Sequence, residues 1–199
     1  MKKIMFNDRF RLTEAVKKGA KTMTRRHVPE KVIVDGKVWA YSQMKYSDPH
    51  EALRAYIVSK APYKVGDRIA IAQSYYQLEK EIEQLGLPLT LKEEKRKSAG
   101  YKNKMYVKAD DMPDYIIITG VNAEHLQDIS DEDCQKEGIY PLSDTSSFHK
   151  PKTVYTYIGG KLFDKPQWAF RSLFIKSGGK REYWEKNEWV YVYEFELVD

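Results

Sequence analysis

The sequence predicts an α+β fold in which a small mixed β-barrel is flanked by helices. Three observations carry this prediction: the indicated strands are short, turn residues separate them, and helices are few. Short strands must bury their apolar faces against a second layer or by closing into a barrel. The chain of 199 residues is long enough to bury a core, so we expect one domain over residues 1–199. Variable insertions are expected near residues 29–62, 79–104 and 140–180.

The chain begins with a short predicted helix. Phe10, Thr13 and Val16 recur at helical spacing, and Gly19 follows as a C-terminal stop. Lys21 is therefore expected in the turn beyond the helix, at the start of an extended segment.

The middle of the chain indicates a hairpin, a helix and two strands, expected over residues 32–39, 49–59, 69–71 and 115–119. Asp35-Gly36 is a typical hairpin turn, and the turn Gly66-Asp67 precedes the next strand. The strand at 115–119 is almost continuously apolar, which predicts a central position in the sheet. The charged segment 79–104 is expected to be an exposed, partly helical insertion.

A third helix has clear end signals. Ser130 precedes it as an N-cap, Asp133 is the expected capping-box partner, and Gly138 ends it. Glu137 then lies in the last turn, where the helix dipole disfavours a negative charge. Its carboxyl is suited to handling a proton unless a cation lies beside it.

The last third is expected to hold an irregular connection over 140–164, a helix that Pro166 opens, and a final strand over 189–197. Apolar and other residues alternate along that strand. Trp168 and Trp184 are expected in the core rather than stacked on bases.

Composition argues against several classes of protein. The single cysteine, Cys134, rules out an internal disulfide and a thiolate metal cluster, and its acidic neighbours 131–133 favour an inert thiol. The four histidines show no ligand spacing, so neither a metal nor a cofactor is expected. No apolar run of ~18 residues or signal-peptide core is present, so we expect a cytoplasmic protein with no membrane partner.

A basic segment is the strongest local signal for function. The window 17–26 holds five positive charges and no carboxylate, and includes two hydroxyl side chains. Fork-shaped cations and hydroxyls suit a phosphate, a carboxylate or a base edge. The net charge of +5 and the 15 tyrosines also permit an RNA partner. A solvated basic loop is the simpler alternative.

Four segments, in order, resemble the landmarks of ASCH-domain proteins of the PUA-like superfamily, closest to the phage- and prophage-borne members. They are GAKTMTRR (19–26), VGDRIAI (65–71), LQDISDED (126–133) running to EGI (137–139), and WEKN (184–187) leading into WVYV (189–192). Together they span nearly the whole chain.

The resemblance implies a PUA-like β-barrel with a basic cleft between barrel and helices that takes RNA or a nucleoside. Small bacterial members include amidohydrolases that remove the acetyl group from N4-acetylcytidine, while other relatives are reported as ribonucleases. Carried over by motif position, the catalytic set of those amidohydrolases corresponds to Lys21, Thr24 and Glu137. Further candidates for ligand contact are Thr22, Arg25, Arg26, Asp67, Gln73 and Tyr75.

The chemistry of such a set can be argued from the residues. Burial and neighbouring cations lower the pKa of a lysine, so Lys21 can act as a base toward the hydroxyl of Thr24 or a water. Glu137, if protonated, can pass a proton to a departing amine. Backbone amides at the Gly19 turn are candidates for binding the oxyanion.

Each of these residues also has a structural alternative. Lys21 and Arg26 can bind a phosphate or cap a helix end, and the hydroxyl of Thr24 can satisfy a local backbone amide. Glu137 can pair with Arg25 or Arg26 and hold the helix against the loop. Asp67 is expected to set a β-turn.

One position departs from the family pattern. Phage-type members commonly have a glutamate after the strand that follows Gly-Asp, where this chain has Gln73. A glutamine can read a base edge but cannot act as an acid or base. Three functions therefore stay open: binding of RNA or a modified nucleoside, amide hydrolysis, and a phage-derived interaction module without activity. The substrate and the oligomeric state are not determined by the sequence.

Overall fold

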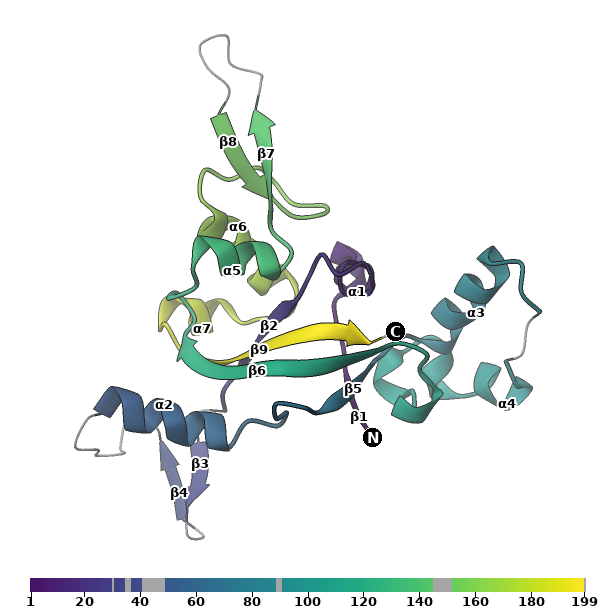
Figure 1. Cartoon of the computed structure of the whole chain (residues 1–199), viewed down its shortest axis with the longest axis horizontal. Coiled ribbons are helices and arrows are strands. Elements are labelled where there is room, and N and C mark those ends of the chain that lie inside the picture. The colour runs from purple at the N-terminus through teal and green to yellow at the C-terminus, as the bar shows by residue number, and fades with distance from the viewer. Residues whose placement is uncertain (30, 35–36, 41–48, 89–90, 145–151, 199) are drawn as a thin grey trace.

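The computed structural model describes residues 1–29, 31–34, 37–40, 49–88, 91–144 and 152–198 (Figure 1). It is a mixed α+β arrangement of one five-stranded sheet, two separate two-stranded hairpins and helices packed around the sheet. The sheet has the order β1-β5-β6-β9-β2, so strands far apart in the sequence are neighbours. Its strands are β1 (Lys2–Ile4), β2 (Met23–His27), β5 (Arg68–Ile71), β6 (Tyr115–His125) and β9 (Trp189–Val198).

The remaining elements surround this sheet. The hairpins are β3 (Lys31–Val34) with β4 (Lys37–Ala40), and β7 (Tyr140–Asp144) with β8 (Lys152–Thr156). The helices are α1 (Leu12–Lys17), α2 (Pro49–Ser59), α3 (Tyr75–Gln84), α4 (Glu93–Arg96), α5 (Asp131–Lys136), α6 (Pro166–Lys176) and α7 (Arg181–Glu185). Short 3₁₀ turns are η1 (Asp8–Phe10), η3 (Ala99–Tyr101), η4 (Lys104–Tyr106) and η5 (Ala109–Asp111).

The two longest strands form the centre of the sheet. β6 and β9 pair antiparallel from Tyr115↔Val198 to His125↔Trp189, with a register shift between Ile118 and Gly120. The prediction of a central strand at 115–119 is confirmed, although the strand continues to His125. The first half of β9 pairs with β2 on one side, and β9 pairs with β6 along its length on the other. β6 also pairs with β5, so β6 and β9 connect the two edges of the sheet.

The described strands form an open sheet, so the predicted closure into a barrel is wrong for this part of the chain. β1 and β2 are its edges, and neither pairs with the other. β1 has only three residues before the chain turns into η1. Arg26 on β2 donates from Nη2 to the carbonyl of Met5 at 2.8 Å, so a side chain spans the gap that a ladder would fill in a barrel.

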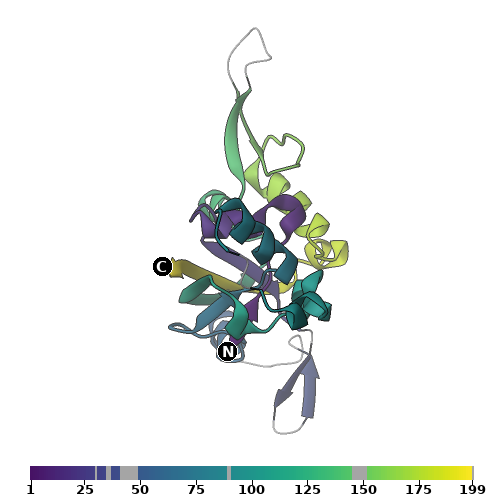
Figure 2. The same cartoon turned by 90° about the vertical axis from the view of Figure 1, so that its right-hand side faces the viewer.

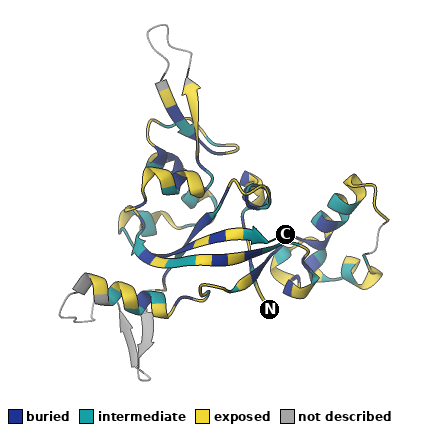
Figure 3. Ribbon diagram, in the orientation of Figure 1, coloured by how far each residue is buried: buried dark blue, intermediate teal, exposed yellow. Residues whose placement is uncertain are grey.

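The main core lies between the sheet and helices α1, α2, α5 and α6. Residues such as Val16, Ile57, Ile118, Phe170 and Phe195 are at most 3 % exposed, and Figure 3 shows the buried residues concentrated along the sheet. A smaller cluster around Tyr75, Leu78 and Met112 packs the α3 region against β5. Figure 2 shows the β7–β8 and β3–β4 hairpins projecting at opposite ends of the molecule.

Several sequence predictions hold. α1 ends before Gly19, α2 covers 49–59, Pro166 opens α6, and the charged segment 79–104 is partly helical. β3 and β4 pair as the expected hairpin, whose predicted turn at 35–36 lies outside the described residues.

Three predictions need correction. The segment 140–164 contains the β7–β8 hairpin rather than only irregular chain. Trp168 is 52 % exposed rather than in the core, because it lies on the outer face of α6. Ser130 does cap α5 by accepting from the backbone of Asp133 at 3.0 Å, but the carboxylate of Asp133 binds Arg25 instead of completing a capping box.

Candidate functional site

Two chain turns bring the basic segment against the end of α5. Gly19 (φ +68°) lets the chain leave α1, and Gly138 (φ +103°) lets it leave α5, both in a conformation that favours glycine. The backbone of Thr22 then donates to the carbonyl of Lys136 at 3.0 Å, and its carbonyl accepts from Phe195 of β9 at 2.9 Å. These bonds fix the segment 21–24 between the sheet and α5.

Lys21 is a buried cation whose ammonium is fully hydrogen-bonded. Its side chain is 2 % exposed. Nζ donates to the carbonyl of Met23 at 2.6 Å, to the carbonyl of Glu137 at 2.9 Å and to Oε2 of Glu137 at 2.5 Å. An ammonium has three donors, so every one of them has an acceptor. Glu137 is 5 % exposed, which makes this a buried ion pair.

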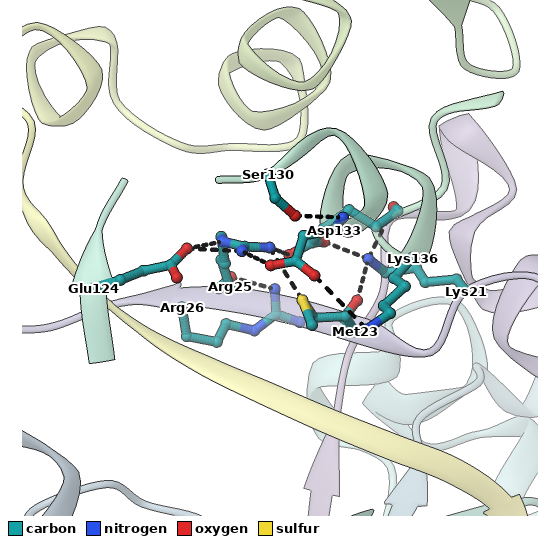
Figure 4. Close-up of polar contacts among 9 residues, drawn as sticks. Lys21, Met23, Arg25, Arg26, Glu124, Ser130, Asp133 and Lys136 are labelled. Atoms are coloured by element: carbon teal, nitrogen blue, oxygen red, sulfur yellow. Dashed lines mark hydrogen bonds and ion pairs between the residues drawn. The ribbon is translucent and has the colours of Figure 1, made fainter. Parts of the chain in front are cut away.

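Arg25 lies at the centre of three carboxylates (Figure 4). Its Nη2 lies 2.7 Å from Glu124 and 2.9 Å from Asp133, and its Nη1 lies 3.3 Å from Glu137. The guanidinium is also 5.8 Å from the ring centroid of Phe170 on α6. A guanidinium occupied in this way is not available to bind a phosphate.

The pair and its neighbours line a small cavity of about 100 Å³. Its walls come from the N-terminal segment, β2, the end of α5 and α6. The lining residues are Met5, Phe6, Asn7, Leu12, Lys21, Thr24, Arg25, Arg26, Glu137, Phe170, Leu173, Phe174 and Ser177. The structure therefore brings all three predicted catalytic residues, together with Arg25 and Arg26, to one place.

Burial governs the electrostatics of this cavity. It lowers the pKa of Lys21; Glu137 opposes that shift, and Arg26 and Arg25 add to it. Burial also raises the pKa of Glu124, with Arg25 opposing. The pKa of Arg26 is lowered by burial, although an arginine keeps its charge at any ordinary pH. Burial and Glu137 thus act in opposite directions on the charge of Lys21.

The other four predicted ligand contacts are not among the described residues that line the cavity. Thr22 contributes backbone bonds, and Asp67 sets its turn by binding Lys2 and the backbone of Lys64. Gln73 binds Glu81 at 2.6 Å, and the hydroxyl of Tyr75 binds Asp111 at 2.5 Å. Gln73 follows β5 and faces Glu81 on α3, whereas Tyr75 is the first residue of α3 and points to Asp111.

The suggested oxyanion donors at the Gly19 turn are already occupied. The backbone N–H of Gly19 donates to Val16, and those of Ala20 and Lys21 both donate to Ala15. These bonds end α1, so no amide of this turn faces a ligand. The occupation of these donors could not be predicted, because a sequence does not show in which direction a backbone N–H group points.

Sequence reasoning also missed three residues of this region. Glu124 and Asp133 hold Arg25, and Ser177 lines the cavity with a buried Oγ that has no hydrogen-bond partner. Asp133 carried a signal, since a carboxylate four residues before Glu137 lies on the same helix face. Ser177 carried none, because it reaches the cavity only through the packing of α6.

Comparison with protein-family models, with curated proteins and with solved structures gave no match. In the described part of the chain, no helix is long and apolar enough to cross a membrane. The described residues also include no group of three or more histidine, cysteine, aspartate or glutamate side chains arranged to hold a metal ion.

Proposed function

We propose that this protein hydrolyses a small amide of the acylated-nucleoside type, on a PUA-like scaffold of the ASCH kind. The observation that carries the proposal is the buried Lys21–Glu137 pair, whose Nζ and Oε2 atoms are 2.5 Å apart in the wall of a cavity that Thr24 also lines. The four ordered segments that resemble ASCH proteins support the scaffold and the choice of substrate. N4-acetylcytidine is the first substrate to test.

The Lys21–Glu137 ion pair can supply both proton transfers that hydrolysis of an amide requires. Transfer of a proton from Nζ of Lys21 to Oε2 of Glu137 produces a neutral amine and a carboxylic acid, which burial favours by removing both charges. The amine then takes a proton from a water held by Thr24, and the hydroxide adds to the amide carbonyl carbon. The C–N bond breaks as Glu137 protonates the leaving nitrogen. A carboxylic acid and an amine leave, and the ion pair is restored.

The cavity limits what part of the substrate enters. A volume of about 100 Å³ is below the roughly 300–1,000 Å³ of most small-molecule pockets. It suits an acetyl amide and the edge of a base, with the sugar outside. Arg26 supplies a positive charge for the developing oxyanion, and Ser177 supplies a hydroxyl without a partner.

A second candidate is recognition of the nucleoside or its RNA without turnover. The observation that favours it is the saturation of Lys21, since an ammonium with three acceptors has no lone pair to act as a base. Under this alternative, the buried network only shapes the pocket.

The test is release of cytidine from N4-acetylcytidine, followed by chromatography, for wild type, Lys21→Met and Lys21→Met/Glu137→Gln. We expect the rate of cytidine release to fall about 10²–10⁴-fold in both variants, which is the usual contribution of a general base. The double variant removes both charges together, which avoids leaving a buried carboxylate unpaired. Lys17→Met is the matched control, because Lys17 also pairs with two carboxylates, Glu81 and Asp114, but lies outside the cavity.

The outcomes separate the two candidates. Release at the wild-type rate by the double variant contradicts the catalytic assignment. No release by wild type, with N4-acetylcytidine still raising its Tm, supports recognition without turnover. Thr24→Val against Thr24→Ser then reports whether the hydroxyl is needed, because valine keeps the shape and serine keeps the hydroxyl.

A further inference from the structure

Helix α6 has a second face that the buried cavity does not use. Phe170, Leu173 and Phe174 line the cavity on its inner side. Trp168, Arg171 and Ile175 follow one another at positions i, i+3 and i+7, which places them on one stripe of the opposite side. Trp168 is 52 % exposed, whereas Trp184 and Trp189 are partly buried.

That outer stripe forms one wall of a groove of about 460 Å³. The start of α7 and the chain after β8 supply further lining residues. The groove is lined chiefly by Phe163, Trp168, Arg171, Ile175, Lys176 and Arg181, and no carboxylate is among its lining residues. Its volume falls within the roughly 300–1,000 Å³ range of small-molecule sites.

The cations of this groove are not neutralised. In the described part of the chain, Arg171, Lys176 and Arg181 form no ion pair with a carboxylate. The Nε of Arg171 is buried without a hydrogen-bond partner. Lys165 places its Nζ 5.7 Å from the ring centroid of Trp168, so a further cation borders the indole. An exposed indole beside unpaired cations fits a ligand that has both flat bases and phosphates.

We infer that this outer groove of α6 binds single-stranded nucleic acid, with Trp168 stacking on a base and Arg171, Lys176 and Arg181 contacting phosphates. Stacking needs an unpaired base, so a duplex fits poorly. An acidic peptide would use the cations but gain little from an exposed indole. The inference does not depend on the reaction of the buried cavity, because no side chain is shared between the two sites.

The test is fluorescence anisotropy of a labelled oligouridine RNA with wild type, Trp168→Ala and Trp168→Phe. We expect Trp168→Ala to weaken binding about 5- to 100-fold and Trp168→Phe to retain most of it, since any aromatic face can stack on a base. Combined Arg171→Ala, Lys176→Ala and Arg181→Ala changes should reduce the slope of log Kd against log salt by about 2, at roughly 0.7 for each phosphate contact.

Tyr76→Ala is the matched control. Tyr76 is 46 % exposed and has Lys80 at 5.9 Å from its ring, but Lys80 is paired with Glu83 at 2.7 Å. The Tyr76→Ala change should leave RNA affinity unchanged. Equal affinity of wild type and Trp168→Ala, or equal affinity for the single strand and its duplex, overturns the inference. Trp168→Ala should still hydrolyse free N4-acetylcytidine and Lys21→Met should still bind RNA, so failure of one proposal is distinguishable from failure of the other.

Discussion

The two faces of α6 use positive charge in opposite ways. On the inner face, Lys21 and Arg25 are buried and paired with Glu124, Asp133 and Glu137. On the outer face, Arg171 and the exposed Trp168 line a groove that Arg181 of α7 also lines, and no carboxylate is among its lining residues. The comparison teaches that a basic stretch of sequence does not locate a basic surface. Two cations of the basic stretch, Lys21 and Arg25, are neutralised inside the molecule, whereas the cations of the outer groove come from α6 and α7.

The first prediction, with the largest change, concerns the alkylation rate of a thiol buried beside the Lys21–Glu137 pair. Cys134 is fully buried next to this network, and burial raises the pKa of its thiol from the usual 9 to about 12. At a pH below 9 this lowers the thiolate population by roughly 1,000-fold, since each pKa unit is a factor of ten. Native protein should therefore react with iodoacetamide very slowly and unfolded protein quickly, as mass spectrometry can measure. Rapid alkylation of native protein would show that the inner face opens to solvent.

The next effect compares one cation from each face. Arg25→Met leaves the buried carboxylate of Glu137 and the partly buried carboxylates of Glu124 and Asp133 without their common partner, and should cost about 3–5 kcal/mol of unfolding free energy. For a protein of this size that lowers the Tm by roughly 6–20 °C. Arg181→Met removes an unpaired surface cation and should change stability by less than about 0.5 kcal/mol. Calorimetry of both variants checks the contrast, and equal losses would contradict it.

The prediction with the smallest change concerns the acid stability that Asp8, which lines neither site, gives to the fold. Burial raises the pKa of Asp8, but hydrogen bonds from Lys104, Thr13 and Gln77 outweigh it and hold the pKa below the usual 3.8. A carboxyl whose pKa is depressed by folding stabilises the native state above its unfolded pKa. That contribution is lost as pH falls below 3.8 and through the folded value. Asp8→Asn should show a shallower loss of stability in this acid range in denaturant titrations; an unchanged slope would argue against the assignment.

Sequence patterns predicted much of the local structure and part of the site. The apolar run at 115–119 predicted the central strand, Gly19 predicted the end of α1, and Pro166 predicted the start of α6. These are local effects of burial, backbone freedom and helix-end geometry, so a single sequence contains them. Motif order also selected Lys21, Thr24 and Glu137, which the structure places around one cavity.

Other predictions failed because they depend on contacts between distant segments. Gln73 and Tyr75 bind Glu81 and Asp111 outside the cavity, and only the packing of the α3 region against β5 decides this. The two edges of the open sheet are the three-residue β1 and β2, and Arg26 on β2 binds the chain just after β1; hydrophobic periodicity reports neither feature. Trp168 has the hydrophobicity of a core residue, but the roll of α6 against the sheet turns it outward.

Most helices and strands and the types of side chain available could be read from the sequence, because helix ends, strand periodicity and charge are properties of neighbouring residues. Only the tertiary structure decided which charges are neutralised. Lys21 and Glu137 are 116 residues apart, and Arg25 meets Asp133 across 108. The free energy of a buried charge depends on partners within a few ångströms, and folding alone brings such partners together.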